Sequence, residues 1–385
     1  MTHSRPPRRY LDNAATTWPK PEAVLSAWER AGRELGVAAG RGCYREAIEA
    51  DAIRERARAR AAALLGGVDP ARVALPSGAT LALNVAIHGI VQPGDHVIAT
   101  AADHNATLRP LHALAARGAI TCTIVPCDGL GHVDPAEVAA AWQPETRGII
   151  CAHASNVTGA LQDPAALAAV AHDRGGLLLL DAAQSLGQVP IGDAAAWNAD
   201  IVVAPAHKWL HGMAGVAILW AREGVEIEPL VQGGTGMASD SLAMPAAFTD
   251  RLEAGTPDLP ALAALDAAAD WISAETVEQL GSRCRALAAA CADRLRAIRG
   301  TRVFAAIEDG PPIVSFTLEG YDPAELAALL EQAAGVQARS GFHCAACVHE
   351  WLGTRAGGTV RLAFGPFNSA ADVAAVVAAV EQFAT

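Results

Sequence analysis

Lysine is almost absent from this chain. Lys20 and Lys208 are the only lysines among 385 residues, whereas arginine occurs 27 times. An arginine side chain cannot lose its proton in a protein, but a buried lysine can. A lysine that must react as a neutral amine, for example to form a Schiff base, therefore has no arginine substitute. This rarity makes Lys208, in APAHKWL (204–210), a candidate reactive amine, although chance survival of a surface charge explains it equally well.

Other features are also missing. No apolar run approaches the roughly 18 residues of a membrane span, and the N-terminal stretch YLDNAATTWPKP (10–21) is too polar for a signal-peptide core. The net charge of −12 argues against nucleic acid and membrane surfaces as partners. The eight cysteines are scattered through a large acidic chain, which favours reduced thiols and a cytoplasmic location over a disulfide framework.

The first two thirds of the chain alternate between apolar strands and helices. This alternation predicts an α/β fold with a mostly parallel sheet between layers of helices. The strands are nearly all apolar, as a sheet covered on both faces requires. Helices are expected at 46–66, 106–118 and 164–175, a strand, turn and helix at 72–90, and further strands at 95–100, 120–126, 176–185, 199–209 and 215–220. The stretch 148–159 is expected to start as a strand and to end in a polar turn.

The pattern changes after about residue 258. A long helical stretch at 259–298 is followed by a strand at 312–318, a helix at 322–332, a strand at 359–364 and a closing helix. We expect a large domain over 25–258, and a smaller α+β domain formed by 1–24 and 259–385.

Polar residues follow the predicted strands of the large domain. SGAT (77–80) forms a turn that opens a helix, where backbone N–H groups can bind an anion. Asp181 follows four leucines, and Lys208 follows the next strand along the chain. Ligands of open parallel sheets bind at the carboxyl ends of the strands. Together these residues suit pyridoxal phosphate, with a phosphate site, a partner for the ring nitrogen and a Schiff-base lysine. Taken singly, the turn can be purely structural and Asp181 can be a helix cap.

Nine motifs in order give the chain a clear resemblance. It resembles the class V aminotransferase family, in particular the branch of cysteine desulfurases and selenocysteine lyases, which are pyridoxal phosphate enzymes of fold type I. The resemblance runs nearly from end to end. It is carried by YLDNAATTWPKP (10–21), SGAT with LN (77–84), DHNA (103–106), SNVTG (155–159), DAAQSLGQVPI (181–191), HKWLHG (207–212), EAGTPD (253–258), RSGFHCA (339–345) and GTVRLAFGPFN (358–368).

The resemblance implies a role for each matching residue around the cofactor. Lys208 would form the Schiff base, His104 would stack on the pyridine ring, and Asp181 would pair with the ring nitrogen. Gln184 would contact the phenolic oxygen. The phosphate would be held by Ala79 through its backbone N–H, Thr80 and His207. Thr256 would reach the cofactor phosphate of a partner subunit, which implies a homodimer with shared sites.

The resemblance also implies a substrate site and a nucleophile. Asn156 and Arg361 would hold the substrate amino acid, with Arg361 gripping its α-carboxylate, and Arg339 would lie beside them. Cys344 stands at the position of the sulfur-accepting cysteine. The implied reaction converts L-cysteine to L-alanine and leaves a persulfide on Cys344, with selenocysteine as a second substrate and a protein as a sulfur acceptor. Another class V reaction, such as transamination or β-elimination, and a non-catalytic sulfur-relay subunit are the alternatives.

Cys344 lies in the cysteine- and histidine-rich stretch FHCAACVHEW (342–351). A thiolate is the nucleophilic form of cysteine, and His343, His349 and Arg339 are candidates to stabilise it. Cys347 completes a C-x-x-C pattern. It is either a bystander or a reversible disulfide partner of Cys344, because the ligands are too close in sequence for an easy tetrahedral zinc site. We therefore expect no metal.

Overall fold

A seven-stranded sheet forms the centre of the larger part of the molecule in the computed structural model, which describes residues 6–190 and 197–384. The strand order is β2-β8-β7-β6-β5-β3-β4, and β4, β3, β5, β6 and β7 run parallel. The strands are β2 (Val73–Ala74), β3 (His96–Thr100), β4 (Thr121–Val125), β5 (Thr146–Ala152), β6 (Leu177–Asp181), β7 (Ile201–Pro205) and β8 (Ala217–Ala221). The prediction of an α/β fold with a mostly parallel sheet is confirmed.

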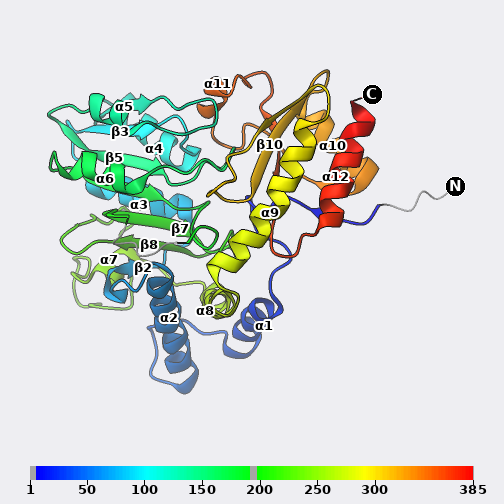
Figure 1. Cartoon of the computed structure of the whole chain (residues 1–385). Helices are drawn as coiled ribbons and strands as arrows, with labels where there is room; N and C mark the ends of the chain where they lie inside the picture. The colour runs from blue at the N-terminus through cyan, green and yellow to red at the C-terminus, as the bar shows by residue number, and fades with distance from the viewer. Residues whose placement is uncertain (1–5, 191–196, 385) are drawn as a thin grey trace.

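Helices cover both faces of this sheet (Figure 1). The leucines of β6 explain why both faces need cover: Leu178 and Leu180 belong to one apolar cluster, while Leu179 belongs to another on the opposite face. Residues from α2 (Arg45–Leu64), α6 (Pro164–His172) and α8 (Leu259–Glu275) join the first cluster, and residues from α3 (Ala79–Ile90), α4 (Asn105–Ala116) and α7 (Phe248–Leu252) join the second.

Two strands depart from the expected pattern. β8 pairs antiparallel with β7, because a loop rather than a crossover helix joins the two strands. That loop carries Lys208. β4 lies at the edge of the sheet and is largely exposed, with Ile124 at 47% exposure, so the apolar stretch at 120–126 is not buried on both faces.

A second, four-stranded antiparallel sheet lies in the C-terminal part, in the order β12-β13-β10-β9. Leu11 joins its apolar cluster, and β1 pairs in parallel with β11, so the N-terminal segment packs with the C-terminal part. The start of the second domain at 259 does not follow from this packing, because residues of α8 belong to the apolar cluster of the large sheet, so the division into 25–258 and 1–24 with 259–385 stays a prediction. The elements are β1 (Arg9–Tyr10), α9 (Val277–Arg296), β9 (Thr301–Phe304), β10 (Ile313–Leu318), α10 (Pro323–Ala334), β11 (Val336–Gln337), β12 (Arg339–Gly341), α11 (Val348–Trp351), β13 (Thr359–Ala363) and α12 (Ala370–Phe383).

The stretch predicted as helical at 259–298 is broken between α8 and α9 at Thr276. Thr276 has a φ of 60°, and its side chain accepts a hydrogen bond from the N–H of Gln279, so it caps α9. The sequence analysis did not predict several short elements: α1 (Glu22–Arg30), a π-helical turn (Ala31–Leu35), a 3-10 turn (Pro70–Arg72), α5 (Pro135–Ala140) and α7.

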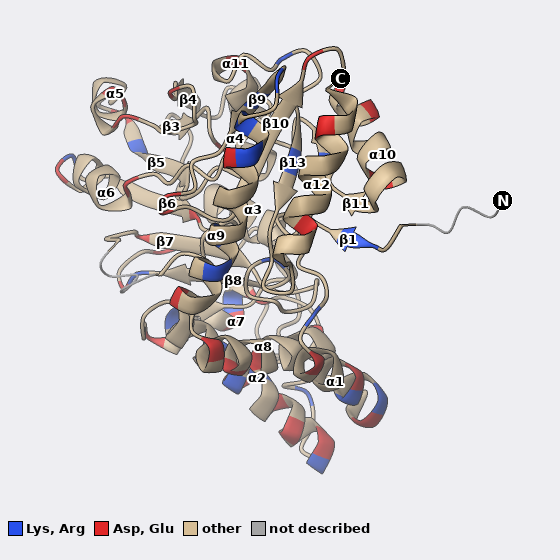
Figure 2. Cartoon of the chain, turned by 45° about the vertical axis from the view of Figure 1, so that its right-hand side comes forward, with Lys and Arg blue, Asp and Glu red and all other residues tan. Residues whose placement is uncertain are grey.

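Charged residues of both signs alternate along α1 and α2, while the strands of the two sheets are mostly uncharged (Figure 2). Among the described helices, none is both long and apolar enough to cross a lipid bilayer.

Candidate active site

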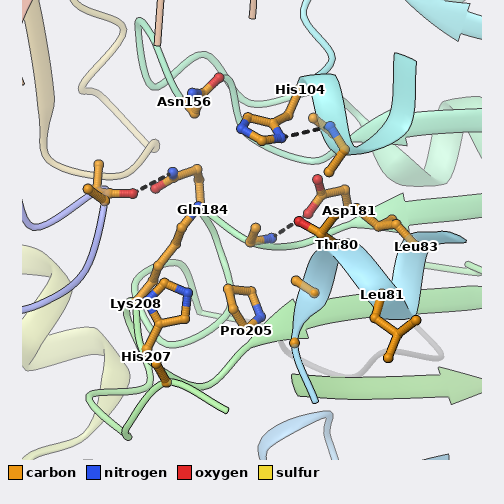
Figure 3. A pocket seen from close by; sticks show the side chains of 18 of the residues that line it. Thr80, Leu81, Leu83, His104, Asn156, Asp181, Gln184, Pro205, His207 and Lys208 are labelled. Atoms are coloured by element: carbon orange, nitrogen blue, oxygen red, sulfur yellow. Dashed lines mark hydrogen bonds between the residues drawn. The ribbon is translucent and has the colours of Figure 1, made fainter. Parts of the chain in front are cut away.

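The carboxyl ends of the parallel strands open onto a cavity of about 460 Å³. Side chains from both sheets and from the N-terminal segment line it. Figure 3 shows His104 on one side of this cavity and His207 with Lys208 on the opposite side. Of the predicted site residues, the cavity brings together Ala79, Thr80, His104, Asn156, Asp181, Gln184, His207, Lys208, Arg339 and Arg361.

Lys208 enters the cavity from the loop between β7 and β8. The loop closes on itself, since the N–H of Gly212 donates to the carbonyl of Ala206 over 2.9 Å and the N–H of His211 donates to that of Lys208 over 2.9 Å. Removal from bulk water lowers the pKa of the Lys208 amine to about 8, and the nearby Asp181 carboxylate opposes this shift. An amine with this pKa is available in its neutral, nucleophilic form close to neutral pH.

Asp181 ends strand β6, next to the strand that leads to Lys208. Its side chain is 4% exposed, and its Oδ1 accepts a hydrogen bond from the N–H of Ala183 over 2.9 Å. Burial raises the pKa of Asp181, while the Lys208 cation counteracts the increase. A buried carboxylate of this kind is suited to a cationic N–H of a ligand.

His104 is the N-cap residue of α4, and its Nδ1 accepts a hydrogen bond from the N–H of Ala106 over 3.0 Å. The bond leaves the ring proton on Nε2 when the imidazole is neutral. Burial, and then the positive charge of Lys208, lowers the pKa of His104 to about 4. The ring is therefore neutral at physiological pH, and it lines the cavity.

The turn before α3 forms the anion-binding corner of the cavity. Gly78 caps α3 without a side-chain hydrogen bond, and Ser77, Gly78, Ala79 and Thr80 all line the cavity. The first N–H groups of a helix have no partner within the helix. Their partial positive charge suits a phosphate, as do the hydroxyls of Ser77 and Thr80.

Gln184 is 3% exposed and is held from two directions. Its Nε2 donates to the carbonyl of Ala14 over 3.0 Å, and its Oε1 accepts from the indole N–H of Trp209 over 2.7 Å. These bonds fix the orientation of the amide. One N–H of the amide remains for a ligand oxygen.

Two arginines come from neighbouring strands of the smaller sheet. Arg339 of β12 and Arg361 of β13 are directly opposite each other in the antiparallel ladder. Arg361 is 1% exposed, and it donates to the carbonyl of Asn156 over 2.9 Å and to Asp12 Oδ1 over 2.8 Å. Its Nε and the Oδ1 of Asn156 are buried without a partner. Two facing cations with an unused donor are suited to a carboxylate ligand.

Cys344 lies beside this arginine pair, where Arg339 Nη2 donates to Cys344 Sγ over 3.1 Å. The backbone of its loop is anchored to the start of α4 and to the turn after β5, because the N–H of Asn105 donates to the carbonyl of Cys344 over 2.7 Å and Asn156 Nδ2 donates to that of His343 over 2.7 Å. Cys344 itself has a φ of 60°, and this strained turn aims its side chain at Arg339. The thiol is partly exposed, and it is free, as is that of Cys347.

Thr256 does not line the main cavity. It is exposed and borders a separate cavity of about 70 Å³ beside α7. His343 and His349 do not contribute to the site as predicted: both are buried, and their rings bond to the hydroxyls of Thr359 and Thr354, respectively.

Asp12 and Ala14 contribute to the site but were not predicted from the sequence, because their partners lie more than 150 residues away in the chain.

The residues present fit pyridoxal phosphate by their chemistry. A lysine amine, a buried carboxylate, a neutral imidazole face and a helix N-terminus line one cavity. Lys208 and Asp181 act on each other electrostatically, but among the described residues neither has an oppositely charged group within the 4.0 Å of a salt bridge, so both remain available to a ligand. Among the same residues, no cluster of histidine, cysteine and carboxylate side chains is arranged to hold a metal ion.

The fold and the cavity agree with a comparison to known families. The chain belongs to the class V aminotransferase family, whose model matches residues 9–376. It therefore has the fold of an enzyme family that typically uses pyridoxal phosphate.

Individual relatives of the chain have names that are more specific than that of the family. The chain is 30% identical to the cysteine desulfurase CsdA of Escherichia coli, over 97% of this chain and 93% of that protein. It is 29% identical to a probable cysteine desulfurase of Methanothermobacter thermautotrophicus, over 97% of this chain and 94% of the relative.

Solved structures extend the likeness to three dimensions. An apo cysteine desulfurase from Thermococcus onnurineus superposes with a TM-score of 0.88 at 25% identity, covering 100% of this chain and 99% of that one. A crystal structure of Escherichia coli CsdA described as the S-sulfonic acid gives a TM-score of 0.86 at 29% identity, covering 97% of this chain and 94% of that one.

Proposed function

We propose that this enzyme is a pyridoxal phosphate-dependent cysteine desulfurase that converts L-cysteine to L-alanine and leaves a persulfide on Cys344. The hydrogen bond from Arg339 Nη2 to Cys344 Sγ carries the proposal. Arg339 lines the same cavity as Lys208, so this bond ties a nucleophilic thiol to the predicted cofactor site. Transamination and β-elimination need the lysine but no thiol.

Bound pyridoxal phosphate would act as an electron sink for the substrate carbon skeleton. Lys208 would bond it covalently, Asp181 would face its ring nitrogen, and His104 would cover one face of the ring. Gln184 would donate to its phenolic oxygen. Its phosphate would accept hydrogen bonds from the N–H of Ala79, from Thr80 and from His207. The depressed pKa values of Lys208 and His207 support these roles, because they keep both groups neutral enough to bond or donate without excess charge.

The substrate would be held by its α-carboxylate. Arg361 would grip this group through its unused Nε, while Asp12 and the carbonyl of Asn156 keep the guanidinium in place. Asn156 would contribute its amide to the same amino acid. The Lys208 amine, once released, would move the proton at the substrate Cα.

The sulfur transfer would take place at the loop of Cys344. The thiolate attacks the Sγ of the substrate, an S–S bond forms, and the Cβ–Sγ bond breaks. Its electron pair stays with Cβ, which takes up a proton equivalent to the one that Cys344 lost. Sulfur is oxidised to the persulfide level while Cβ is reduced to a methyl group, so no external oxidant or reductant is needed. Arg339 would stabilise the attacking thiolate by a charge-assisted hydrogen bond.

Replacement of Cys344 tests this proposal. Cys344→Ala should retain the visible absorption of the bound cofactor and its change on addition of L-cysteine, yet release almost no alanine. Cys347→Ala is the matched control, because it removes a free thiol only three residues away that packs against the apolar cluster of the large sheet. If Cys344→Ala releases alanine at the wild-type rate, a β-eliminating or transaminating activity replaces the proposed one. Selenocysteine should be assayed alongside as a second substrate.

We also propose a homodimer with shared sites. Thr256 is exposed and outside the main cavity of its own chain, which supports a contact with the cofactor phosphate of a partner subunit. The persulfide sulfur would then pass to an acceptor protein or a small thiol at the partly exposed Cys344.

A further inference from the structure

The carbonyl group of His207 receives an unusual number of hydrogen-bond donors. Four donor atoms from the N-terminal segment converge on it: the N–H of Thr17 at 3.1 Å, Thr16 Oγ1 at 3.0 Å, Thr17 Oγ1 at 3.2 Å and Lys20 Nζ at 2.7 Å. Lys20 makes the shortest of these contacts and is the only donor of the four that can carry a charge. A carbonyl oxygen has two lone pairs, so this group is fully used.

This carbonyl belongs to the peptide bond that joins His207 to Lys208. The rest of the loop is held from within, by the bonds from Gly212 to Ala206 and from His211 to Lys208. The peptide before Lys208 is instead held from outside, by residues 16–20, and Thr17 Oγ1 also reaches the Lys208 carbonyl over 2.9 Å. The N-terminal segment therefore fixes the backbone that carries the Lys208 side chain.

Among the described residues, no partner other than Thr17 and the His207 carbonyl explains the presence of Lys20. Its Nζ contacts Thr17 Oγ1 over 2.8 Å and the His207 carbonyl, and among the described residues no carboxylate forms an ion pair with it. It does not line the cavity. Burial lowers its pKa to about 7, which shows that a charge is costly at this place. A lysine ammonium is a compact group with three donors, whereas a guanidinium is a wide planar fork. A single carbonyl oxygen next to a threonine hydroxyl therefore suits lysine.

We propose that Lys20 is a positioning residue that holds the His207–Lys208 peptide so that the Lys208 amine projects into the cavity. The inference rests on the proposed function, in which Lys208 bonds the cofactor and moves a proton. Both lysines of a chain that otherwise uses arginine thus serve one loop: one reacts, and the other fixes its backbone.

The first test uses the apoprotein, so it does not depend on the reaction. Hydrogen exchange should be measured for the amides of His211 and Gly212, which bond within the loop. In Lys20→Met these amides should exchange about 10-fold faster than in the wild type, because the loop opens locally more often. Arg9→Met is the matched control: it removes a cationic donor to the Ala334 carbonyl in the same N-terminal segment, in strand β1, which pairs with β11. It should leave these two amides unchanged.

The second test separates positioning from substrate binding. Lys20→Met should lower kcat for alanine release about 10-fold or more, because a small displacement of a catalytic group is costly. The KM for L-cysteine should stay within about 2-fold, because Arg361 and Asn156 are untouched. Lys20→Arg retains a cationic donor and should fall between Lys20→Met and the wild type in both tests.

Clear results would overturn the inference. Wild-type amide exchange and wild-type kcat in Lys20→Met would show that Lys20 does not hold the loop, and so would equal effects of Arg9→Met. If Lys20→Met does not fold, Lys20→Arg decides: wild-type exchange and kcat in that variant would contradict the requirement for a lysine. If the wild type releases no alanine from cysteine, the proposed function fails, while the exchange measurement still tests the role of Lys20.

Discussion

Arg339 and Arg361 lie opposite each other on the neighbouring antiparallel strands β12 and β13, and both face the cavity that contains Lys208. Directly paired like charges destabilise a sheet unless an anion compensates them. Asp12 supplies one negative charge to Arg361, and the Cys344 sulfur lies 3.1 Å from Arg339. The pair thus divides two tasks between two cations: Arg361 would hold a substrate carboxylate, and Arg339 the attacking thiolate.

This division predicts a specific loss in Arg339→Met. The side chain no longer donates to Cys344 Sγ, so single-turnover release of alanine should slow by about 10-fold or more, because the attacking thiolate loses a charge-assisted hydrogen bond. Arg355→Met is the control, because Arg355 is exposed on the same loop and pairs with Glu350. Equal rates in Arg339→Met and the wild type would remove Arg339 from the reaction.

Because the chain has only two lysines, the titration of each lysine amine can be measured separately. Reductive methylation of the apoprotein, followed by peptide mass spectrometry, reports Lys20 and Lys208 separately. Only the neutral amine reacts, so the rate at Lys208 should rise to half its maximum at a pH of about 8, and that at Lys20 at about 7. A rate at Lys208 that keeps rising to the ordinary lysine value of 10.5 would contradict the desolvated environment described for it.

The fully buried Asp103 should make the stability of the apoprotein depend on pH. It accepts hydrogen bonds from the N–H groups of Thr100 and Ala152, yet burial raises its pKa to about 7. Between pH 7 and the ordinary value of 3.8, the folded protein binds a proton that the unfolded chain does not, so stability rises as the pH falls. The amide of Asp103→Asn cannot bind this proton, so this part of the increase in stability is absent from the variant.

Chemical denaturation of both proteins measures this contribution. The stability of the wild type relative to Asp103→Asn should increase as the pH falls from 7 to 5. A constant difference over this range would show that Asp103 titrates with an ordinary pKa.

Shared sites predict complementation between two impaired chains. Thr256→Val should bind the cofactor more weakly, and Lys208→Ala should not bond it. In a mixed dimer, one site combines the intact Lys208 of the first chain with the intact Thr256 of the second. Co-expression should therefore restore up to about half of the activity, as expected when one of two sites is complete. No recovery in a verified mixed dimer would place Thr256 in the site of its own chain.

Much of the fold was predictable because the relevant signals are local. Four consecutive leucines before Asp181 indicate a strand buried on both faces, and the next apolar run leads to Lys208. Adjacent parallel strands then bring these two residues to one cavity, as the structure has them. The break at Thr276 was not predictable, since the residues on both sides of it favour a helix and the break depends on a single positive φ.

Contacts between segments that are distant in the chain could not be predicted from the sequence. Asp12 bonds to Arg361 across 349 residues, and Lys20 bonds to the carbonyl of His207 across 187. Every residue has a backbone carbonyl, so the amino-acid type of the acceptor does not indicate such a hydrogen bond. The rarity of lysine and the motif YLDNAATTWPKP both include Lys20, but neither indicates its role, which depends on where the N-terminal segment packs.

The central claim is that the substrate sulfur is transferred to Cys344. The direct measurement is mass spectrometry of the peptide that contains Cys344, after the holoenzyme has reacted with L-cysteine labelled with a heavy sulfur isotope and without reductant. We predict that this peptide gains the mass of one heavy sulfur atom, in an amount equal to the alanine released in the first turnover, and that Cys344→Ser gains none. Release of alanine or pyruvate with no labelled sulfur on Cys344 would contradict the account.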